Sequence, residues 1–209
     1  MNDENEMKLN EVEPLDIVVV EEGPEDKPSF ISKVWDVVWL PLLVFILVSV
    51  LFRTVILNGY VPSESMETTI SKESWVLGNR LSVMNTDKIK RYDVIVFKAE
   101  LVPGFPEHVV KRVIGLPGDE ITITEDKILV NGQEVIEDFV SSVDNFQKPG
   151  NYTVPLNGFF VAGDNRANSN DSRKWTYKFV DDDSIVAKAW ANYWFFGFET
   201  IKKYDDNIK

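Results

Sequence analysis

A run of sixteen uncharged residues, 37–52, constrains this chain more than any other feature, because most of its side chains are strongly apolar. Only Arg53 interrupts the apolar character before residue 57. As an α-helix, residues 37–57 would measure about 31 Å, close to the roughly 30 Å of a bilayer's hydrocarbon core. Arg53 lies near enough to the far end for its side chain to reach the headgroups. The run predicts one membrane-spanning anchor over residues 34–57.

Two other interpretations of this run fit less well. A cleaved signal peptide usually has a shorter apolar stretch nearer to the terminus, and no small-x-small site follows here. A buried core helix is rarely this long and this apolar. Trp35 and Trp39 also suit the interface at the start of a membrane span. Charge alone leaves the orientation open, since two lysines precede the run and Arg53 and Lys72 follow it.

The composition excludes some partners and some chemistries. The net charge is -12 at pH 7, so we expect no nucleic-acid partner, which would require a basic face. The chain has no cysteine, which excludes disulfides, thiolate metal sites and a cysteine nucleophile. Residues 1–28 are acidic and lack aromatic side chains, so they predict a disordered acidic tail.

Beyond the apolar run, the pattern predicts β structure. Short apolar segments bounded by charges or turn residues are typical of strands. Asn131 and Gly132 separate two such segments and predict a tight hairpin, because both residues tolerate positive φ. No convincing helix follows the anchor, so we expect a mainly β domain of antiparallel sheets over residues 58–209, with a β-hairpin insertion at about residues 120–158. The predicted strands are residues 93–97, 121–124, 127–130, 133–136 and 185–194.

Three polar or glycine-rich segments stand out from this β pattern. They are residues 62–66 (PSESM), 111–119 (KRVIGLPGD) and 163–173 (GDNRANSNDSR). Each has a plain structural explanation when it is taken alone. Ser63 and Ser65 could be turn hydroxyls, the second segment ends in a typical turn sequence, and the third could be a charged loop.

The combination, in this order and behind an N-terminal anchor, resembles the type I signal peptidases, the bacterial leader peptidase family. In that family a PSxSM box holds a serine nucleophile, a KRVIGLPGD box holds a lysine base, and a GDNRxNSxDSR box supports the lysine. Residues 93–97 also look like the family's intervening strand. The resemblance covers residues 61–194 and implies an antiparallel β-sheet protease fold, like that of the repressor-type proteases, behind one transmembrane helix.

The resemblance assigns roles to the matching residues. Ser65 would attack the scissile carbonyl after Lys111, the general base, takes its proton. The Ser65 backbone N–H and the Ser63 hydroxyl would form the oxyanion hole. Ser169 would hydrogen-bond to the lysine and orient it. The further supporting residues would be Asp164, Arg166, Asp171 and Arg173.

Elementary chemistry is compatible with a lysine base. A lysine with an ordinary pKa of about 10.4 is neutral in only about one molecule in 2,500 at pH 7, but burial can lower that pKa by roughly 3–5 units. Lys111 is suited to burial, because valines and an isoleucine surround it in the sequence. The alternative base is His108, the one histidine, but strand alternation would point it away from the Lys111 face. A Ser-His-Asp triad is therefore disfavoured.

We expect no cofactor and no metal. The acidic residues between 164 and 171 could suggest a calcium loop, but Arg166 stands where such a loop needs an oxygen ligand. No glutamate follows in the position of a bidentate ligand.

The family's substrates are exported preproteins with small side chains at the first and third positions before the cut. Such a peptide would lie extended beside residues 60–62 and beside the strand leading to Lys111. The resemblance also implies a single-pass protein of the cell membrane, in contact with the lipid bilayer and near the secretion translocon, with its catalytic domain on the extracytoplasmic side. The candidates for the two shallow apolar pockets are Val61, Met66, Ile70, Val76, Val109 and Val110.

Some positions depart from the family pattern without removing a catalytic group, so they bear on specificity and rate. They are Thr68 for proline, Tyr92 for glycine, Val109 for tyrosine and Ala167 for aspartate.

Two other functions are alternatives. A self-cleaving repressor-type protease should follow a DNA-binding domain rather than an anchor, and a silent peptide-binding protein has no need of the complete serine and lysine set. The aromatic residues 195–198 fit either a core or a bilayer surface.

Overall fold

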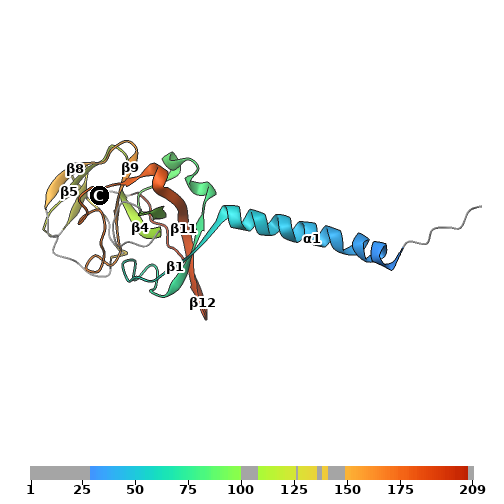
Figure 1. The fold of residues 1–209 in the computed structure, drawn as a ribbon. Helices are drawn as coiled ribbons and strands as arrows, with labels where there is room; N and C mark the ends of the chain where they lie inside the picture. The colour runs from blue at the N-terminus through green and yellow to red at the C-terminus, as the bar shows by residue number, and fades with distance from the viewer. Residues whose placement is uncertain (1–28, 100–107, 126, 136–137, 141–148, 207–209) are drawn as a thin grey trace, which may run out of the picture. The chain divides into compact units, whose positions relative to one another are not determined.

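The computed structural model describes residues 29–99, 108–125, 127–135, 138–140 and 149–206 (Figure 1). The chain divides into two compact units, residues 1–45 and 46–209. The predicted acidic tail lies outside the described residues.

The apolar run forms helix α1, Phe30–Val55. Residues Lys33–Val55 are long and apolar enough to cross a membrane, and no other helix in the described part of the chain meets both conditions. Most of the apolar side chains of α1 are exposed, as expected of a surface that lipid covers. The helix ends two residues before the predicted limit, because Leu57 already belongs to a strand and is buried in the β core.

The larger sheet has the strand order β1-β2-β11-β3-β4-β9-β10, with β12 paired to β11. Every one of these pairs is antiparallel. The predicted strand at 185–194 is β11, which pairs with β2, β3 and β12 (Figure 1). The strands are β1 (Ile56–Val61), β2 (Ser74–Asn79), β3 (Val94–Lys98), β4 (His108–Gly115), β9 (Gly158–Ala162), β10 (Val180–Asp181), β11 (Ile185–Trp194) and β12 (Gly197–Thr200).

A smaller sheet follows, with the order β7-β6-β5-β8. The predicted hairpin joins β6 to β7 through Asn131 and Gly132, whose φ angles of 52° and 78° are both positive. Figure 1 shows β5 and β8 side by side, on the part of this unit away from β12. The strands are β5 (Glu120–Ile123), β6 (Ile128–Val130), β7 (Gln133–Glu134) and β8 (Gly150–Thr153).

The core explains why the central strands are continuously apolar rather than alternating. Successive side chains of a strand point to opposite faces, and β3 is covered on both. Ile95 and Phe97 pack in one apolar cluster with β9 and β10, and Val94 and Val96 pack in another with β1 and β2. A third cluster joins the smaller sheet to Tyr92 of the larger body.

The structure confirms the prediction of a mainly antiparallel β fold with one N-terminal apolar helix. After α1, the helical segments among the described residues are three short 3-10 turns. They are η1 (Leu81–Val83), η2 (Thr86–Lys88) and η3 (Asp182–Ser184).

Candidate active site

The segment after β1 forms a tight turn that carries Ser65. Backbone bonds from Glu67 N to Glu64 O and from Ile70 N to Met66 O close the turn. The Ser65 carbonyl accepts a bond of 3.1 Å from Asn165 N. The third polar segment, residues 163–173, therefore holds the turn through the main chain of Ser65 itself.

Lys111 reaches Ser65 from the middle of β4. Its Nζ lies 2.6 Å from Ser65 Oγ and 3.1 Å from the Val110 carbonyl oxygen, and donates to both. Both side chains are buried, with Lys111 only 3% and Ser65 only 7% exposed. A lysine and a serine hydroxyl in direct contact, away from water, are the geometry that proton transfer requires.

Burial lowers the pKa of Lys111 from 10.5 to about 8. Asp171 and Asp164 act in the opposite direction, because their negative charges favour the ammonium, while the charge of Arg173 adds to the effect of burial. At pH 7, a pKa near 8 leaves about one lysine in ten neutral, which is about 250 times the fraction at the ordinary pKa. A neutral amine beside the serine is thus readily available.

Ser63 and Ser65 lie on the same side of the turn. Their hydroxyl oxygens are 3.2 Å apart. This spacing puts the Ser63 hydroxyl next to the atom that would carry the new bond, where an oxyanion donor has to be.

Asp171 and Arg173 form a buried bidentate ion pair beside Lys111. Arg173 Nε and Nη2 donate to the two carboxylate oxygens, each over 2.8 Å. Gly163 N also donates to Asp171, and Arg173 Nη2 bonds to the Arg166 carbonyl. Although burial opposes ionisation, the bonds from Arg173 and Gly163 hold the pKa of Asp171 below its ordinary value. The pair fixes the loop, and its two charges act in opposite directions on the pKa of Lys111.

Ser169 is buried in this loop and lies beside Asp171. Within the described residues, Lys111 Nζ bonds to Ser65 and Val110 rather than to Ser169. The lysine is turned toward Ser65, so the expected contact with Ser169 is not made here. Its orienting role stays a prediction.

A second buried ion pair was not predicted from the sequence. Arg112, next to Lys111 on β4, points to the opposite face and donates to both oxygens of Asp164 over 2.8 and 2.6 Å. Arg112 also donates to Thr69 Oγ1, and its guanidinium lies 4.2 Å from the centre of the Phe139 ring. The sequence placed Asp164 in a supporting role but could not supply its partner, because an arginine beside a lysine is most simply explained as surface. This pair ties β4 to the turn behind Ser65.

Gly163 sits where the serine turn and the supporting loop meet. A Cβ at this position would clash with the Ser65 carbonyl oxygen and with the Ser169 hydroxyl. The missing side chain therefore allows the two segments to approach each other.

A cavity of about 260 Å³ opens beside Ser65 and Lys111. Of the predicted pocket residues, Val61, Met66, Val109 and Val110 line it. Ile70 and Val76 do not line it, because both are packed in the apolar core under β1 and β2. The sequence did not single out Asn168 and Asn170, which also line the cavity. The full lining is Tyr60, Val61, Pro62, Ser63, Ser65, Met66, His108, Val109, Val110, Lys111, Asn168 and Asn170.

His108 lies at the exposed start of β4 and contributes to the cavity lining. Lys111, and not this imidazole, contacts Ser65 Oγ. Within the described ranges, no group of three or more His, Asp or Glu side chains could hold a metal ion.

A buried serine-lysine pair in an antiparallel β domain, preceded by a helix long enough to span a membrane, is the arrangement expected of a membrane-associated serine peptidase. The family described as "Signal peptidase, peptidase S26" matches residues 34–194. This chain belongs to that family. The match includes all three polar segments of the sequence and the cavity between them.

Individual relatives carry the same description. Signal peptidase I of Leptolyngbya laminosa is 36% identical over 140 residues, which cover 65% of this chain and 67% of that protein. Signal peptidase I of Bacillus caldolyticus is 35% identical over 168 residues, which cover 74% of this chain and 88% of that protein. A crystal structure of a signal peptidase I from Enterococcus faecalis V583 is 32% identical, with a TM-score of 0.40, and covers 48% of this chain and 96% of that chain.

Proposed function

We propose that this protein is a membrane-bound serine endopeptidase that removes N-terminal signal peptides from exported preproteins, with Ser65 as the nucleophile and Lys111 as the general base. The observation that carries the proposal is the 2.6 Å contact between Lys111 Nζ and Ser65 Oγ in a buried site. Family membership supplies the substrate class.

The reaction follows from the positions of these groups. Neutral Lys111 takes the proton of Ser65 as Oγ attacks the scissile carbonyl, and the resulting oxyanion receives bonds from the Ser63 hydroxyl and the Ser65 N–H. The ammonium form of Lys111 then protonates the departing amine, which leaves an acyl-enzyme. The neutral lysine then takes a proton from water as the water attacks the acyl carbonyl, and it returns that proton to Ser65 Oγ as the acyl bond breaks and the signal peptide leaves.

The substrate can pair with a free strand edge on each side of the cavity. Within the described residues, β1 is paired only to β2, and residues 108–111 of β4 are paired only to β3. The free edges of both strands border the cavity. An extended peptide adds to such edges through its main chain and leaves its side chains to be selected by pockets. A cavity as small as about 260 Å³ suits the small side chains that precede a signal-peptide cut.

The membrane anchor keeps the site close to the bilayer. β1 begins at Ile56, directly after α1 ends at Val55, and Ser65 follows only ten residues after the helix. Even a fully extended chain of this length spans only about 35 Å. We place the catalytic unit on the extracytoplasmic side of the cell membrane, in contact with lipid and near the translocon, where a preprotein presents its cleavage site.

The test incubates the detergent-solubilised protein with a preprotein carrying an Ala-x-Ala site, and maps the cut by mass spectrometry. The wild type should cleave after the second alanine, whereas Ser65→Ala and Lys111→Ala should not. Ser63→Ala should lower kcat by about 100-fold or more with little change in KM, because the lost hydroxyl acts only on the oxyanion.

His108→Ala is the matched control in the same cavity, and it should retain activity. Normal processing by Ser65→Ala or Lys111→Ala would refute the mechanism. The orientation has its own test: a protease added to intact cells should digest the catalytic unit, and digestion only after lysis would contradict an extracytoplasmic site.

A further inference from the structure

The segment that follows β12 packs against the catalytic unit, and the mechanism above does not use it. Ile201 donates its N–H to the Trp190 carbonyl over 2.9 Å and packs against the apolar cluster under β1 and β2. Tyr204 packs against the separate cluster that contains the smaller sheet. Residues 201–206, called here the C-terminal strap, therefore connect one apolar cluster to the other.

An ion pair fixes the far end of the strap. Asp206 accepts a hydrogen bond of 2.6 Å from Arg91 Nε. Arg91 is itself held in place, since it is only 4% exposed and its Nη1 donates to Asp119 and to the Ile114 carbonyl. With both ends of the strap attached, Tyr204 is held against the protein between them.

The ring of Tyr204 lies against the guanidinium of Arg112. The ring centre is 5.4 Å from Arg112 Cζ, and the Phe139 ring centre is 4.2 Å from the same atom. The two ring centres are 5.2 Å apart in an edge-to-face arrangement, so both rings lie on one side of the guanidinium. Arg112 and Phe139 are buried and Tyr204 is half-buried, so the tyrosine is the member of this group that meets the solvent. A cation beside aromatic rings is attracted more strongly when water is excluded.

Both side chains that Tyr204 contacts hold the serine turn. Arg112 Nη2 donates to Thr69 Oγ1 over 2.9 Å, and Thr69 Oγ1 donates to Asp164 over 2.5 Å. The Phe139 carbonyl accepts a bond of 2.8 Å from Thr68 Oγ1. The strap therefore acts on the turn through two neighbouring residues, without itself reaching the catalytic cavity.

We propose that Tyr204 is a positioning residue for the reaction: the C-terminal strap keeps Arg112 dry and fixed, and Arg112 keeps Ser65 within reach of Lys111. The proposal rests on the proposed function, because it assumes that Ser65 is the nucleophile. The strap lies beyond residue 194, where the family match ends, so it is a feature of this chain that the family description does not include.

Tyr204→Leu removes the ring but keeps an apolar side chain at the same place. It should lower kcat for a preprotein about tenfold, because a turn displaced by 1 Å would lose about 100-fold and this displacement should be smaller. KM should not change, since Tyr204 is outside the described lining of the catalytic cavity. Tyr204→Phe keeps the ring and should retain the wild-type kcat.

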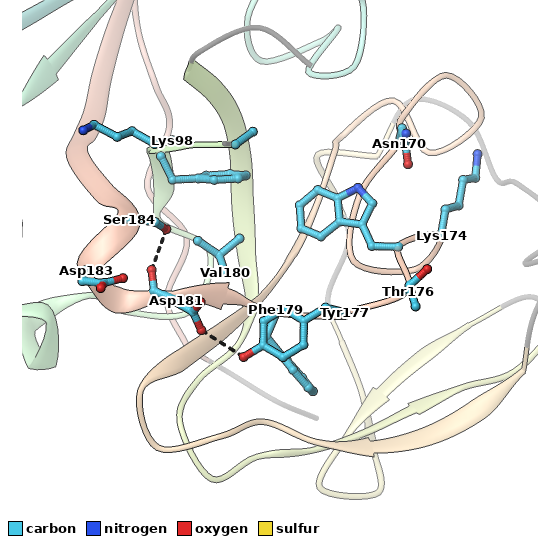
Figure 2. Close-up of a pocket in the computed structure, with 13 residues that line it drawn as sticks. Lys98, Asn170, Lys174, Thr176, Tyr177, Phe179, Val180, Asp181, Asp183 and Ser184 are labelled. Atoms are coloured by element: carbon cyan, nitrogen blue, oxygen red, sulfur yellow. Dashed lines mark hydrogen bonds between the residues drawn. The ribbon is translucent and has the colours of Figure 1, made fainter. Parts of the chain in front are cut away.

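Tyr177→Leu is the matched control. The Tyr177 ring is also packed edge-to-face on a phenylalanine, with its centre 5.7 Å from that of Phe179. Its hydroxyl donates to Asp181 over 2.9 Å, as Figure 2 shows. This variant removes a similar ring without touching Arg112, so kcat and KM should both stay at their wild-type values.

Hydrogen exchange of the full-length protein in detergent tests the effect on the turn without catalysis. The N–H groups of Thr69 and Ile70 both bond to the Met66 carbonyl. In Tyr204→Leu they should exchange about tenfold faster, a factor on the order of one desolvated cation–π contact. The amides of β5, which pairs with β6 and β8, should exchange as in the wild type.

Three results would overturn the proposal: a wild-type kcat in Tyr204→Leu, an equal loss of kcat in Tyr204→Phe, or an exchange rate that rises equally in the turn and in β5. The two proposals can fail separately. If the wild type does not cleave but Tyr204→Leu speeds exchange only in the turn, the peptidase proposal fails and the action of the strap on the turn stands. If the wild type cleaves and Tyr204→Leu changes neither kcat nor exchange in the turn, the peptidase proposal stands and the strap proposal falls.

Discussion

At the scale of single residues, Lys111 is a compromise between stability and activity. The site holds it where burial lowers its pKa to about 8, and this makes the neutral base available. The same burial means that the folded protein carries an ammonium in an apolar place at pH 7. A difference between 10.5 and about 8 corresponds to about 3 kcal/mol of free energy. Under the proposed mechanism, function, and not stability, explains a lysine at this position.

Lys111→Met should therefore be inactive but more stable at pH 7, by up to about 3 kcal/mol in the free energy of unfolding. The folded-state pKa is below the unfolded-state value, so the destabilisation by Lys111 is complete below pH 8 and disappears as the pH rises from 8 to 10.5. The gain from the methionine should shrink over the same interval. Denaturant unfolding followed by circular dichroism measures both effects.

Lys90→Met is the control, since Lys90 is exposed and its replacement should change stability little at any pH. A Lys111→Met protein that is less stable than the wild type at pH 7 would show that the buried lysine does not destabilise the fold.

Two departures from the family pattern acquire a physical meaning in the structure. Tyr92, where the family has glycine, has φ 69°, a conformation that glycine adopts without strain. Its ring compensates by packing against Phe139 and Tyr204. Thr68 has φ 87°, which proline cannot adopt, and its hydroxyl donates to the Phe139 carbonyl. The turn after the nucleophile is thus held by side-chain contacts rather than by a rigid ring.

At the scale of elements, local patterns predicted what local forces determine. We could predict the hairpin at Asn131 and Gly132 and the strand β11 from the sequence. A turn and a long apolar run both depend on residues that are adjacent in the chain. β1, β2 and β9 were not among the predicted strands. Leu57 looked like the end of the anchor, since an apolar side chain suits both lipid and a β core. The pairing of β1 with β2, which lies farther along the sequence, assigns Leu57 to the β core rather than to the anchor.

The active-site residues also fall into two groups: those that the local sequence predicts and those that depend on contacts with distant segments. Ser65 and Lys111 were predicted from a resemblance, because their segments are distinctive. The partner of Asp164 could not be predicted, since the face on which Arg112 lies depends on the register of β4 against β3 and β9. Ile70 and Val76 were expected to line the pocket because they are apolar and close to Ser65 in the sequence. Their side chains instead pack in the apolar core, a contact that the sequence alone does not reveal.

Gly163→Ala tests how closely β9 and its loop must approach the serine turn. The new Cβ would meet the Ser65 carbonyl oxygen, a backbone atom that cannot rotate away. A displacement of the nucleophile by about 1 Å should lower kcat/KM by about 100-fold, with the β fold retained in the circular dichroism spectrum.

Gly59→Ala is the matched control on β1. Its Cβ would lie 3.5 Å from a methyl carbon of Leu57 and 3.6 Å from one of Val76, which are ordinary contacts. Near-normal activity of Gly163→Ala would show that the loop and the turn can separate without cost to catalysis.

At the scale of the whole molecule, exposed aromatic side chains suggest a second contact with the bilayer besides α1. Phe195 and Phe196, in the turn between β11 and β12, are 91% and 90% exposed. Trp194 and Phe198 on either side are also exposed. Aromatic side chains gathered at one tip are unfavourable in water and suit the membrane interface. These residues, which the sequence left undecided between core and membrane, are not in the core.

Replacing both Phe195 and Phe196 by serine should lower preprotein processing in proteoliposomes by about fivefold, roughly 1 kcal/mol, because the site loses its orientation on the membrane. Processing in detergent should not change. Leu156→Ser, at another exposed apolar residue, is the control and should have no effect in either medium. An equal loss in liposomes and in detergent would mean that the turn supports the fold instead.

The most direct test of the central claim, that a neutral Lys111 activates Ser65, is the pH dependence of kcat/KM for a signal-peptide substrate. Burial lowers the pKa of Lys111 to about 8, and only the neutral form accepts the proton. The rate constant should therefore rise about tenfold per pH unit below 8 and level off above it, in the wild type and in His108→Ala alike. If kcat/KM instead levels off near pH 6.5, and its rise below that pH is absent in His108→Ala, the base is the histidine. That result would contradict the account.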